Sequence, residues 1–232
     1  MSRIRPLVVI LLSGGFCLSC AHASDLGPFP SPDRPVAAII SSAYSTEEER
    51  DRKGEAVRVM DRLGIRPGMR VADIGAGDGY YTVRLARRLG PGATIYAEDV
   101  NGRYLEGLRR RLGREGLSHV KVVEGAPRDP RLPTAAVDVA LLSHVYHEIE
   151  NPYELFYRLH VSLAPGGHVA IIDVDKPTQA HGTPPALLRC ELMALGYRQV
   201  DFTSLAPADG YLAVFVPPIT LPTPTAIVPC RQ

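Results

Sequence analysis

The sequence lacks an excess of charge of either sign. Its 232 residues contain 26 lysines and arginines against 25 aspartates and glutamates, which gives a net charge of +1. A surface that binds nucleic acid needs a strong positive balance, so we exclude nucleic acid as a partner. Several arginines between positions 109 and 114 face away from the helical stripe of Leu105, Leu108 and Leu112, and we interpret them as a solvated surface.

Cysteine is also scarce. Two of the four cysteines, Cys17 and Cys20, lie near the start of the chain, and no C-x-x-C spacing typical of a zinc site occurs after them. The other two, Cys190 and Cys230, would be the thiols left in an exported protein. Because thiols oxidise in such a compartment, we predict an intramolecular disulfide between them.

A hydrophobic run long enough to span a membrane is missing as well. The apolar run from Leu7 to Leu18 is short and interrupted by serine and glycine. Arg3 and Arg5 precede it, and Ala21-His22-Ala23 follows with the A-x-A pattern of a cleavage site. The pattern predicts a signal peptide over residues 1–23, export to the periplasm, and no transmembrane span in the mature chain.

A lipoprotein is the alternative interpretation of the same segment. Cys20 would then carry the lipid. Cys17, however, stands where the motif usually has leucine, three positions before the modified cysteine. Cleavage after Ala23 is therefore the interpretation we adopt.

The rest of the chain suits one folded domain with proline-rich segments at both ends. With 45% hydrophobic residues, it can bury one substantial core. Residues 24–44 are predicted to be an extended segment, residues 45–216 the domain, and residues 217–232 a proline-rich tail outside the core. Ser45 and Glu48 form a capping-box pattern that predicts a single helix ending near Leu63.

The stretch from Val71 to Gly79 organises this domain. An apolar strand runs into a glycine-rich turn, and the turn opens a helix that continues to Leu89. Glycines at 75, 77 and 79 allow a ligand to approach the backbone and the start of the helix. The spacing is G-x-G-x-G, whereas a dinucleotide fingerprint would need glycine where Tyr80 stands. The turn therefore favours a nucleotide-like cofactor other than a dinucleotide.

Further strands are predicted along the chain, at 93–97, 119–123, 136–142 and 168–174, and helical patterns separate several of them. Segments 200–202 and 211–216 are predicted to close the sheet as an antiparallel pair. Ligands of an open α/β sheet bind beyond the carboxyl ends of its strands, so the residues after each strand are the candidates for a site.

Glu98 and Asp99 end the second of these strands. Asp99 follows the glycine turn by about 20 residues, the distance at which a βαβ unit places an acid on a ribose. Neighbouring strand residues point to opposite faces, so only one of the two can bind that ribose. We predict that it is Asp99.

The fourth strand ends in a tract rich in reactive side chains, His144 to Glu148. Histidine can act as a base near neutral pH, and we predict His147 as the base, with Tyr146 and Glu148 orienting it or a substrate. The alternative is that His144 lines a cofactor pocket and His147 caps a helix. Asp173 and Asp175 lie on one face of the next strand, but no third carboxylate or amide accompanies them, so we predict no metal site.

The run Asp73-Ile74-Gly75-Ala76-Gly77-Asp78-Gly79 resembles motif I of the class I S-adenosylmethionine-dependent methyltransferases, and the Leu-Ala-Pro-Gly-Gly turn ending at Gly167 is similar to theirs. The resemblance covers roughly residues 60–216. It implies an α/β fold with a Rossmann-like, seven-stranded, mostly parallel sheet, helices on both faces and an antiparallel C-terminal strand. It also implies that the charged helix after residue 46 lies over the cofactor cleft.

The same resemblance implies which residues bind the cofactor. Asp73 would lie near the amino end of its methionine part, and Ala126 replaces the aspartate that commonly bonds the adenine amino group, so the Ala126 backbone or Asp129 is expected to substitute. The implied cofactor-binding residues are Asp73, Gly75, Ala76, Gly77, Gly79, Asp99, Val100, Gly125, Ala126, Ser143 and His144.

The function implied is transfer of a methyl group from S-adenosylmethionine to a small-molecule acceptor. Two other functions stay open. One is a protein of the same fold that binds S-adenosylmethionine or a nucleotide without catalysis, which the export signal favours because this cofactor is made in the cytoplasm. The other is a nicotinamide-dependent oxidoreductase, which the glycine spacing disfavours.

Overall fold

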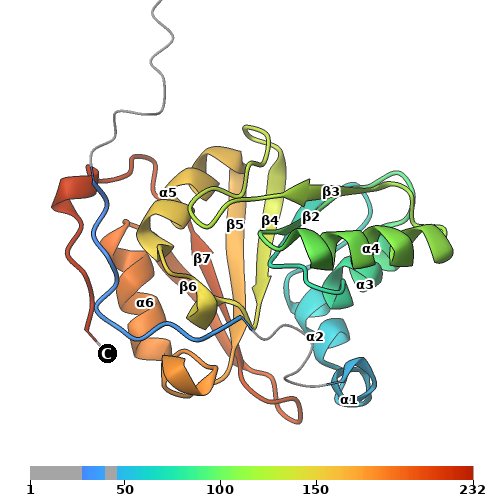
Figure 1. Cartoon of the computed structure of the whole chain (residues 1–232), viewed down its shortest axis with the longest axis horizontal. Helices are drawn as coiled ribbons and strands as arrows, with labels where there is room; N and C mark the ends of the chain where they lie inside the picture. Colours follow the sequence, from blue (N-terminus) through green and yellow to red (C-terminus); the bar gives the residue numbers. More distant parts are fainter. Residues whose placement is uncertain (1–27, 40–45, 232) are drawn as a thin grey trace, which may run out of the picture.

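The computed structural model of the chain describes residues 28–39 and 46–231. The predicted signal peptide, Cys20 and Ser45 lie outside the described residues. Within the described part, a seven-stranded sheet carries helices on both faces (Figure 1).

The strand order is β3-β2-β1-β4-β5-β7-β6. The strands from β3 to β5 pair in parallel, whereas β7 runs antiparallel to both of its neighbours. This confirms the predicted Rossmann-like α/β fold, including its antiparallel C-terminal strand. The strands are β1 (Arg70–Ile74), β2 (Thr94–Asp99), β3 (Val120–Glu124), β4 (Val137–Ser143), β5 (Leu163–Asp173), β6 (Arg198–Ser204) and β7 (Tyr211–Val216).

Helices connect most of these strands, and short 3-10 turns lie near the sheet edges. The α-helices are α1 (Glu47–Arg52), α2 (Glu55–Arg62), α3 (Tyr80–Leu89), α4 (Gly102–Arg114), α5 (Pro152–Ser162) and α6 (Pro185–Ala194). The 3-10 turns are η2 (Tyr146–Glu148), η3 (Thr178–Ala180) and η4 (Pro224–Ala226).

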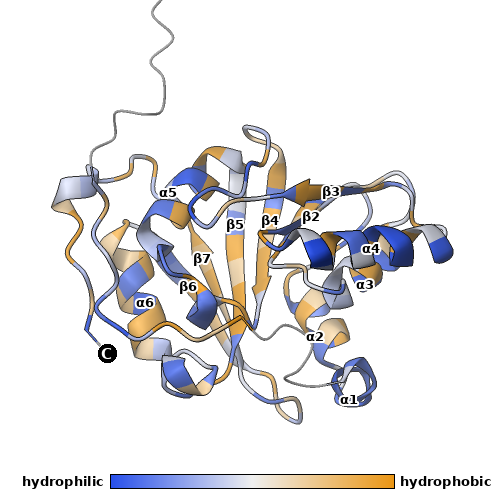
Figure 2. Cartoon of the chain, in the orientation of Figure 1, coloured by the Kyte–Doolittle hydropathy of each residue, from blue (hydrophilic) through white to orange (hydrophobic). Residues whose placement is uncertain are grey.

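The two faces of the sheet are covered by different helices because successive strand residues point in opposite directions. Val71 and Ile95 pack in one apolar cluster with residues of α2, α3 and α4. Their neighbours Ala72 and Tyr96 pack in a second cluster with residues of α5 and α6. In Figure 2 the central strands are largely hydrophobic, while α1 and much of α4 are hydrophilic.

Three strands end at the same level of the sheet. Ile74 of β1 is in register with Glu98 of β2 and with Leu142 of β4. The segments that follow these strands therefore meet at one edge, which is where an open α/β sheet binds its ligands.

The predicted single helix before β1 is two helices in the structure. Gly54 lies between α1 and α2 with φ +69°, a left-handed conformation that glycine adopts without a steric cost. Thr46 caps α1 in place of Ser45, and its side chain accepts a hydrogen bond from the amide of Glu49. The break separates α1, which has no buried residue, from α2, whose apolar face joins the core.

The two proline-rich segments pack together on the α5 and α6 side of the sheet (Figure 1). A disulfide joins Cys190 of α6 to Cys230, as predicted. Asp33 bridges to Arg231 and its carboxylate accepts a bond from that side chain. The expectation that the tail stays outside the core is wrong in part, because Ile227 is 5% exposed and joins the second apolar cluster.

Arg34 anchors the N-terminal segment to α6 and to the residues after β4. Its guanidinium is buried and forms an ion pair with the Glu191 carboxylate at 3.0 Å. It also donates to the carbonyls of Tyr146 and Ile149, which follow β4. Further along the segment, the amide of Ala37 donates to the carbonyl of His147. Among residues 28–39 and 46–231, no helix is long and apolar enough to cross a membrane.

Candidate active site

A cavity of about 340 Å³ opens at the carboxyl ends of β1, β2 and β4. This volume falls within the range of small-molecule sites. Most of the residues predicted to bind the cofactor line it, and so do His147 and Glu148. The predicted cofactor residues in its wall are Asp73, Gly75, Ala76, Gly77, Asp99, Val100, Ala126, Ser143 and His144.

The glycine turn forms one wall of the cavity. Gly75 and Gly77 have φ of +70° and +52°, so the turn needs residues that tolerate the left-handed region. A Cβ on Gly75 would lie 2.7 Å from the Val145 side chain, which approaches from the segment after β4. The amide of Ala76 donates to the carbonyl of Glu98 and ties the turn to β2.

Asp99 lies against this turn. Its carboxylate accepts hydrogen bonds from the amides of Gly77 and Asn101, both at 2.8 Å. Burial raises the pKa of Asp99, and these amide bonds oppose the rise. A carboxylate held in this way keeps lone pairs for hydroxyl donors in the cavity.

Glu98 also reaches the cavity, which the sequence analysis did not foresee. It points toward the other face of the sheet, where a Cβ on Gly125 would overlap its carboxyl group. Burial, followed by the charge of Asp99, raises the pKa of Glu98 to about 8. Glu98 is therefore protonated near neutral pH, while its neighbour accepts bonds from the turn.

Asp73 is buried in β1, two residues before Gly75. Its carboxylate accepts a 2.6 Å hydrogen bond from the Thr82 hydroxyl of α3. Burial raises the pKa of Asp73 to about 6, although the Thr82 bond acts in the opposite direction. The Thr82 bond fixes the Asp73 carboxyl where β1 ends and the cavity begins.

Two of the predicted glycines serve packing and do not line the cavity. Gly79 has φ +88° and begins α3, and a Cβ there would lie 2.4 Å from the Leu108 side chain of α4. Gly125 leaves the space that Glu98 fills. Both positions need glycine because neighbouring side chains occupy the space of a Cβ, so the expectation of direct cofactor contact is corrected.

The predicted replacements for the adenine-binding aspartate are also engaged elsewhere. The amide of Ala126 donates to the carbonyl of Asp129, and the amide of Asp129 donates back to Ala126. The Asp129 side chain accepts from the amide of Arg131 and does not line the cavity. Ala126 and Pro127 line the cavity with apolar side chains.

Helix α1 covers the glycine turn with an arginine that the sequence analysis did not single out. Arg50 lines the cavity, pairs with Glu55 at 2.6 Å and donates to the Ser143 hydroxyl at 2.8 Å. Its guanidinium also lies 3.7 Å from the ring centroid of Tyr80. The only sequence signal for this role was the dense charge of residues 47–53, which suits a solvated helix equally well.

His144 has a left-handed backbone, with φ +54°, and faces the same charged group. Its Nε2 lies 3.7 Å from the Glu55 carboxylate. Burial alone would raise the pKa of Glu55, but hydrogen bonds from His144 and Arg50 outweigh it and lower this pKa to about 2. His144 thus lines the cavity, as His147 does.

His147 lies on η2 and lines the cavity, and its ring is fixed by Asp173 at the end of β5. Nδ1 is 3.0 and 3.1 Å from the two carboxylate oxygens of Asp173. Asp173 is fully buried and also accepts from the Thr183 hydroxyl and the Val174 amide. Asp175, which the sequence placed on the same strand face, is exposed, while Asp173 orients His147.

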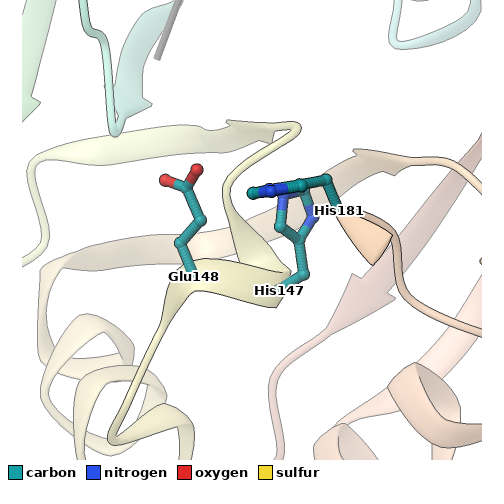
Figure 3. A group of neighbouring side chains, drawn as sticks. All are labelled: His147, Glu148 and His181. Atoms are coloured by element: carbon teal, nitrogen blue, oxygen red, sulfur yellow. The ribbon is translucent and has the colours of Figure 1, made fainter. Parts of the chain in front are cut away.

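The ring of His181, from the segment after η3, meets the edge of the His147 ring at 5.6 Å between centroids. Figure 3 shows these two rings together with Glu148, which comes from the same 3-10 turn as His147. His181 is separated from this turn by α5 and β5, so sequence spacing alone gave no sign of the contact.

Tyr146 does not belong to this group. Its side chain is fully buried on the other side of η2, where its hydroxyl donates to Glu191 at 2.7 Å. Burial raises the pKa of Tyr146 well above its usual value. Its predicted role in orienting His147 or a substrate is therefore replaced by a role in the core.

The cavity wall is acidic, which bears on the class of ligand. A cationic ligand is favoured there, and a pyrophosphate is disfavoured, since like charges repel in a partly desolvated site. Carboxyl groups other than the neutral Glu98 come from Glu47, Asp73, Asp78, Asp99, Glu148 and Glu150, against Arg50, His144 and His147.

Comparison with known proteins agrees with this geometry. Residues 72–171 match the family described as "Methyltransferase domain". The chain is 27% identical over 119 residues to the ubiquinone/menaquinone biosynthesis C-methyltransferase UbiE of Vibrio campbellii, covering 51% of this chain and 46% of that protein. The chain spans about half the length of the curated relatives it matches.

Solved structures share the fold. A SAM-dependent methyltransferase from Aquifex aeolicus is 22% identical and superposes with a TM-score of 0.64, covering 69% of this chain and 88% of that one. A possible exported protein from Bordetella parapertussis is 17% identical, with a TM-score of 0.57, and covers 73% of this chain and 68% of that one.

The sheet order and the glycine turn define a methyltransferase fold of the Rossmann-like class. Together with the family match over residues 72–171, they support a class I S-adenosylmethionine-dependent methyltransferase.

Proposed function

We propose that this protein transfers the methyl group of S-adenosylmethionine to a small-molecule acceptor bound in the same cavity. One observation carries the proposal: the glycine turn, Asp99 and the Asp173-bound His147 line a single cavity or orient the groups that line it. A cofactor and an acceptor can therefore meet in line, and positioning supplies most of what methyl transfer needs.

The cofactor half of the cavity fits S-adenosylmethionine. Asp99 would accept hydrogen bonds from the ribose hydroxyls, and the open backbone of Gly75 and Gly77 would admit the ligand closely. Asp73 would lie toward the amino group, and Val100 and Ala126 toward the adenine. The acidic wall suits a sulfonium cation with an ammonium group.

The acceptor half would contain His147 and Glu148. In the transfer, a lone pair of the acceptor forms a bond to the methyl carbon while the carbon–sulfur bond breaks, which leaves S-adenosylhomocysteine. Where the attacking atom carries a proton, a nearby imidazole can accept it. His147 is suited to this because Asp173 holds Nδ1 and leaves Nε2 available.

Export is part of the proposal. The disulfide between Cys190 and Cys230 supports an oxidising compartment, where such bonds persist. The structurally similar Bordetella protein is itself described as a possible exported protein. The proposed location is the periplasm, with cleavage after Ala23.

Calorimetry of the mature chain, residues 24–232, tests the cofactor half. We expect S-adenosylmethionine and S-adenosylhomocysteine to bind, and NADH to give neither heat nor a shift in melting temperature. Binding of NADH alone would support the oxidoreductase instead. Incubation with methyl-labelled cofactor and a periplasmic small-molecule extract then separates the enzyme from a protein that only binds, because only the enzyme transfers label.

A further inference from the structure

A second chemical feature lies at the wall of the cavity, where His147 and Glu148 line it and His181 packs behind them. His147, Glu148 and His181 each offer a ligand atom, and these atoms lie within 4.8 Å of one another. Figure 3 shows the two imidazoles close together and the Glu148 side chain beside them, from η2 and from the segment after η3. We propose that these three side chains bind one divalent transition-metal ion of the zinc type.

The surroundings of His147 are those of a metal ligand. Nδ1 is held by the Asp173 carboxylate, so Nε2 is the nitrogen that remains for an ion. Metal-bound histidines commonly donate their other nitrogen to a carboxylate, which fixes the ring and makes it a better ligand. Asp173 is itself fixed by the Thr183 hydroxyl and the Val174 amide.

His181 gives an independent observation. Its Nδ1 is buried and has no hydrogen-bond partner in the described part of the chain. A buried polar atom without a partner is costly, and a bound ion is one explanation of it. The backbone of His181 is also left-handed, with φ +56°, a conformation that is uncommon outside glycine.

Backbone contacts of residues 178–183 fix the position of the His181 ring. The amide of His181 donates to the carbonyl of Thr178, and that of Thr183 donates to Val174 at the end of β5. Between them, a Cβ on Gly182 would lie 2.6 Å from the Val174 carbonyl. The chain therefore passes close to β5 and turns His181 toward His147.

The ligand set selects the kind of ion. Two imidazoles and one carboxylate suit zinc and similar metals, whereas magnesium and calcium prefer oxygen ligands alone. In tetrahedral zinc sites the ligand atoms are about 3.3 Å apart, given metal–ligand distances of about 2.0–2.1 Å, so modest side-chain rotations would suffice. Three protein ligands leave one position open, as in catalytic zinc sites.

Since this inference rests on the proposed function for its role, the open position would face the acceptor. A metal there lowers the pKa of a bound hydroxyl or thiol, whose proton then leaves to solvent before methyl transfer. The acceptor would thus carry an oxygen or sulfur that can ionise, and His147 would act as a ligand in place of a base.

Titration of the tag-free, metal-stripped mature chain with Zn²⁺ tests the site directly. We expect one ion per chain and a rise in melting temperature. His181→Ala and Glu148→Gln each remove one ligand from a partly exposed segment. Their affinity for Zn²⁺ should fall about 100-fold or more, because even changes to residues that only hydrogen-bond a ligand cost about 10–100-fold. His119→Ala, which removes a half-buried imidazole before β3, should bind Zn²⁺ like the parent.

Cobalt serves as a spectroscopic probe of the same site. Co²⁺ bound by two imidazoles and a carboxylate should give visible absorption in the parent and in His119→Ala, and none in His181→Ala. Equal zinc affinity in all variants, or no zinc binding by the parent, overturns the metal site. If the chain binds S-adenosylmethionine but not zinc, the proposed function stands and the metal site is overturned. If it binds zinc but not S-adenosylmethionine, the metal site stands and the proposed function is overturned.

Discussion

The carboxylate of Asp99 accepts a hydrogen bond from the backbone amide of Gly77, 2.8 Å away. The end of β2 and the turn after β1 are thus held together before any ligand arrives. An acid that is already oriented loses little freedom when a ribose binds to it. This contact preorganises the part of the cavity wall that we propose binds the cofactor.

Replacing Asp99 tests this half. Asp99→Ala should lower the affinity for S-adenosylmethionine ten- to a hundredfold, because a hydrogen bond to a charged group is worth about 1.5–3 kcal/mol. Calorimetry measures the change. Glu98→Gln is the matched control and should bind nearly as the parent does, since Glu98 is neutral at pH 7. A larger loss of affinity in Glu98→Gln than in Asp99→Ala would show that Glu98, and not Asp99, binds the ribose.

Gly77→Val tests the approach of the ligand to the turn. The two added methyls would occupy the space of the cofactor, and we expect no detectable binding of S-adenosylmethionine. A side chain at φ +52° also strains the backbone. Gly90→Val controls for that strain, because Gly90 has φ +79° and nothing lies within 4 Å of its Cβ direction. Similar loss of stability in both, with binding lost only in Gly77→Val, is the expected outcome.

His147→Ala should lower turnover by at least tenfold and leave cofactor affinity nearly unchanged, if His147 contacts the acceptor as we propose. Steady-state kinetics together with calorimetry measure the two effects. His119→Ala provides the control for removal of an imidazole elsewhere. If cofactor affinity in His147→Ala falls as much as turnover does, His147 belongs to the cofactor half.

Glu98 predicts a dependence of stability on pH. Its pKa is about 8 in the folded protein, above the ordinary value of 4.5, so the folded state holds a proton that the unfolded state loses. Its contribution to stability is full below the unfolded pKa and declines as pH rises toward 8. Glu98→Gln should therefore gain in melting temperature over the parent between pH 5 and pH 8. Each unit of pKa shift corresponds to about 1.4 kcal/mol. A pH-independent difference would contradict the shift.

The disulfide closes a loop of 40 residues between α6 and the tail. In the chain-entropy model such a loop stabilises the fold by roughly 4 kcal/mol. Denaturant unfolding of Cys190→Ser/Cys230→Ser should show a loss of this order, and reductant should destabilise only the parent. Mass spectrometry of the non-reduced protein provides the direct check, in which two free thiols would contradict the bond.

The sequence by itself determined the central strands and the glycine turn that follows the first of them. Continuous apolar runs predict buried parallel strands, and glycine at 75 and 77 allows a turn that other residues resist. The resemblance to the methyltransferase family implied how these strands form one sheet. Asp99 followed from its distance along the βαβ unit. These features depend on neighbours in sequence, which is why they could be predicted.

Only the tertiary structure decided the acceptor half. Whether Tyr146 or His147 faced the cavity depended on the burial of Arg34 against Glu191, which draws the Tyr146 hydroxyl into the core. The meeting of His147 with Asp173 and His181 requires β5 and its following loop to fold back on η2. Contacts between distant segments leave no periodic trace in the sequence, because they arise from packing and not from local backbone preference.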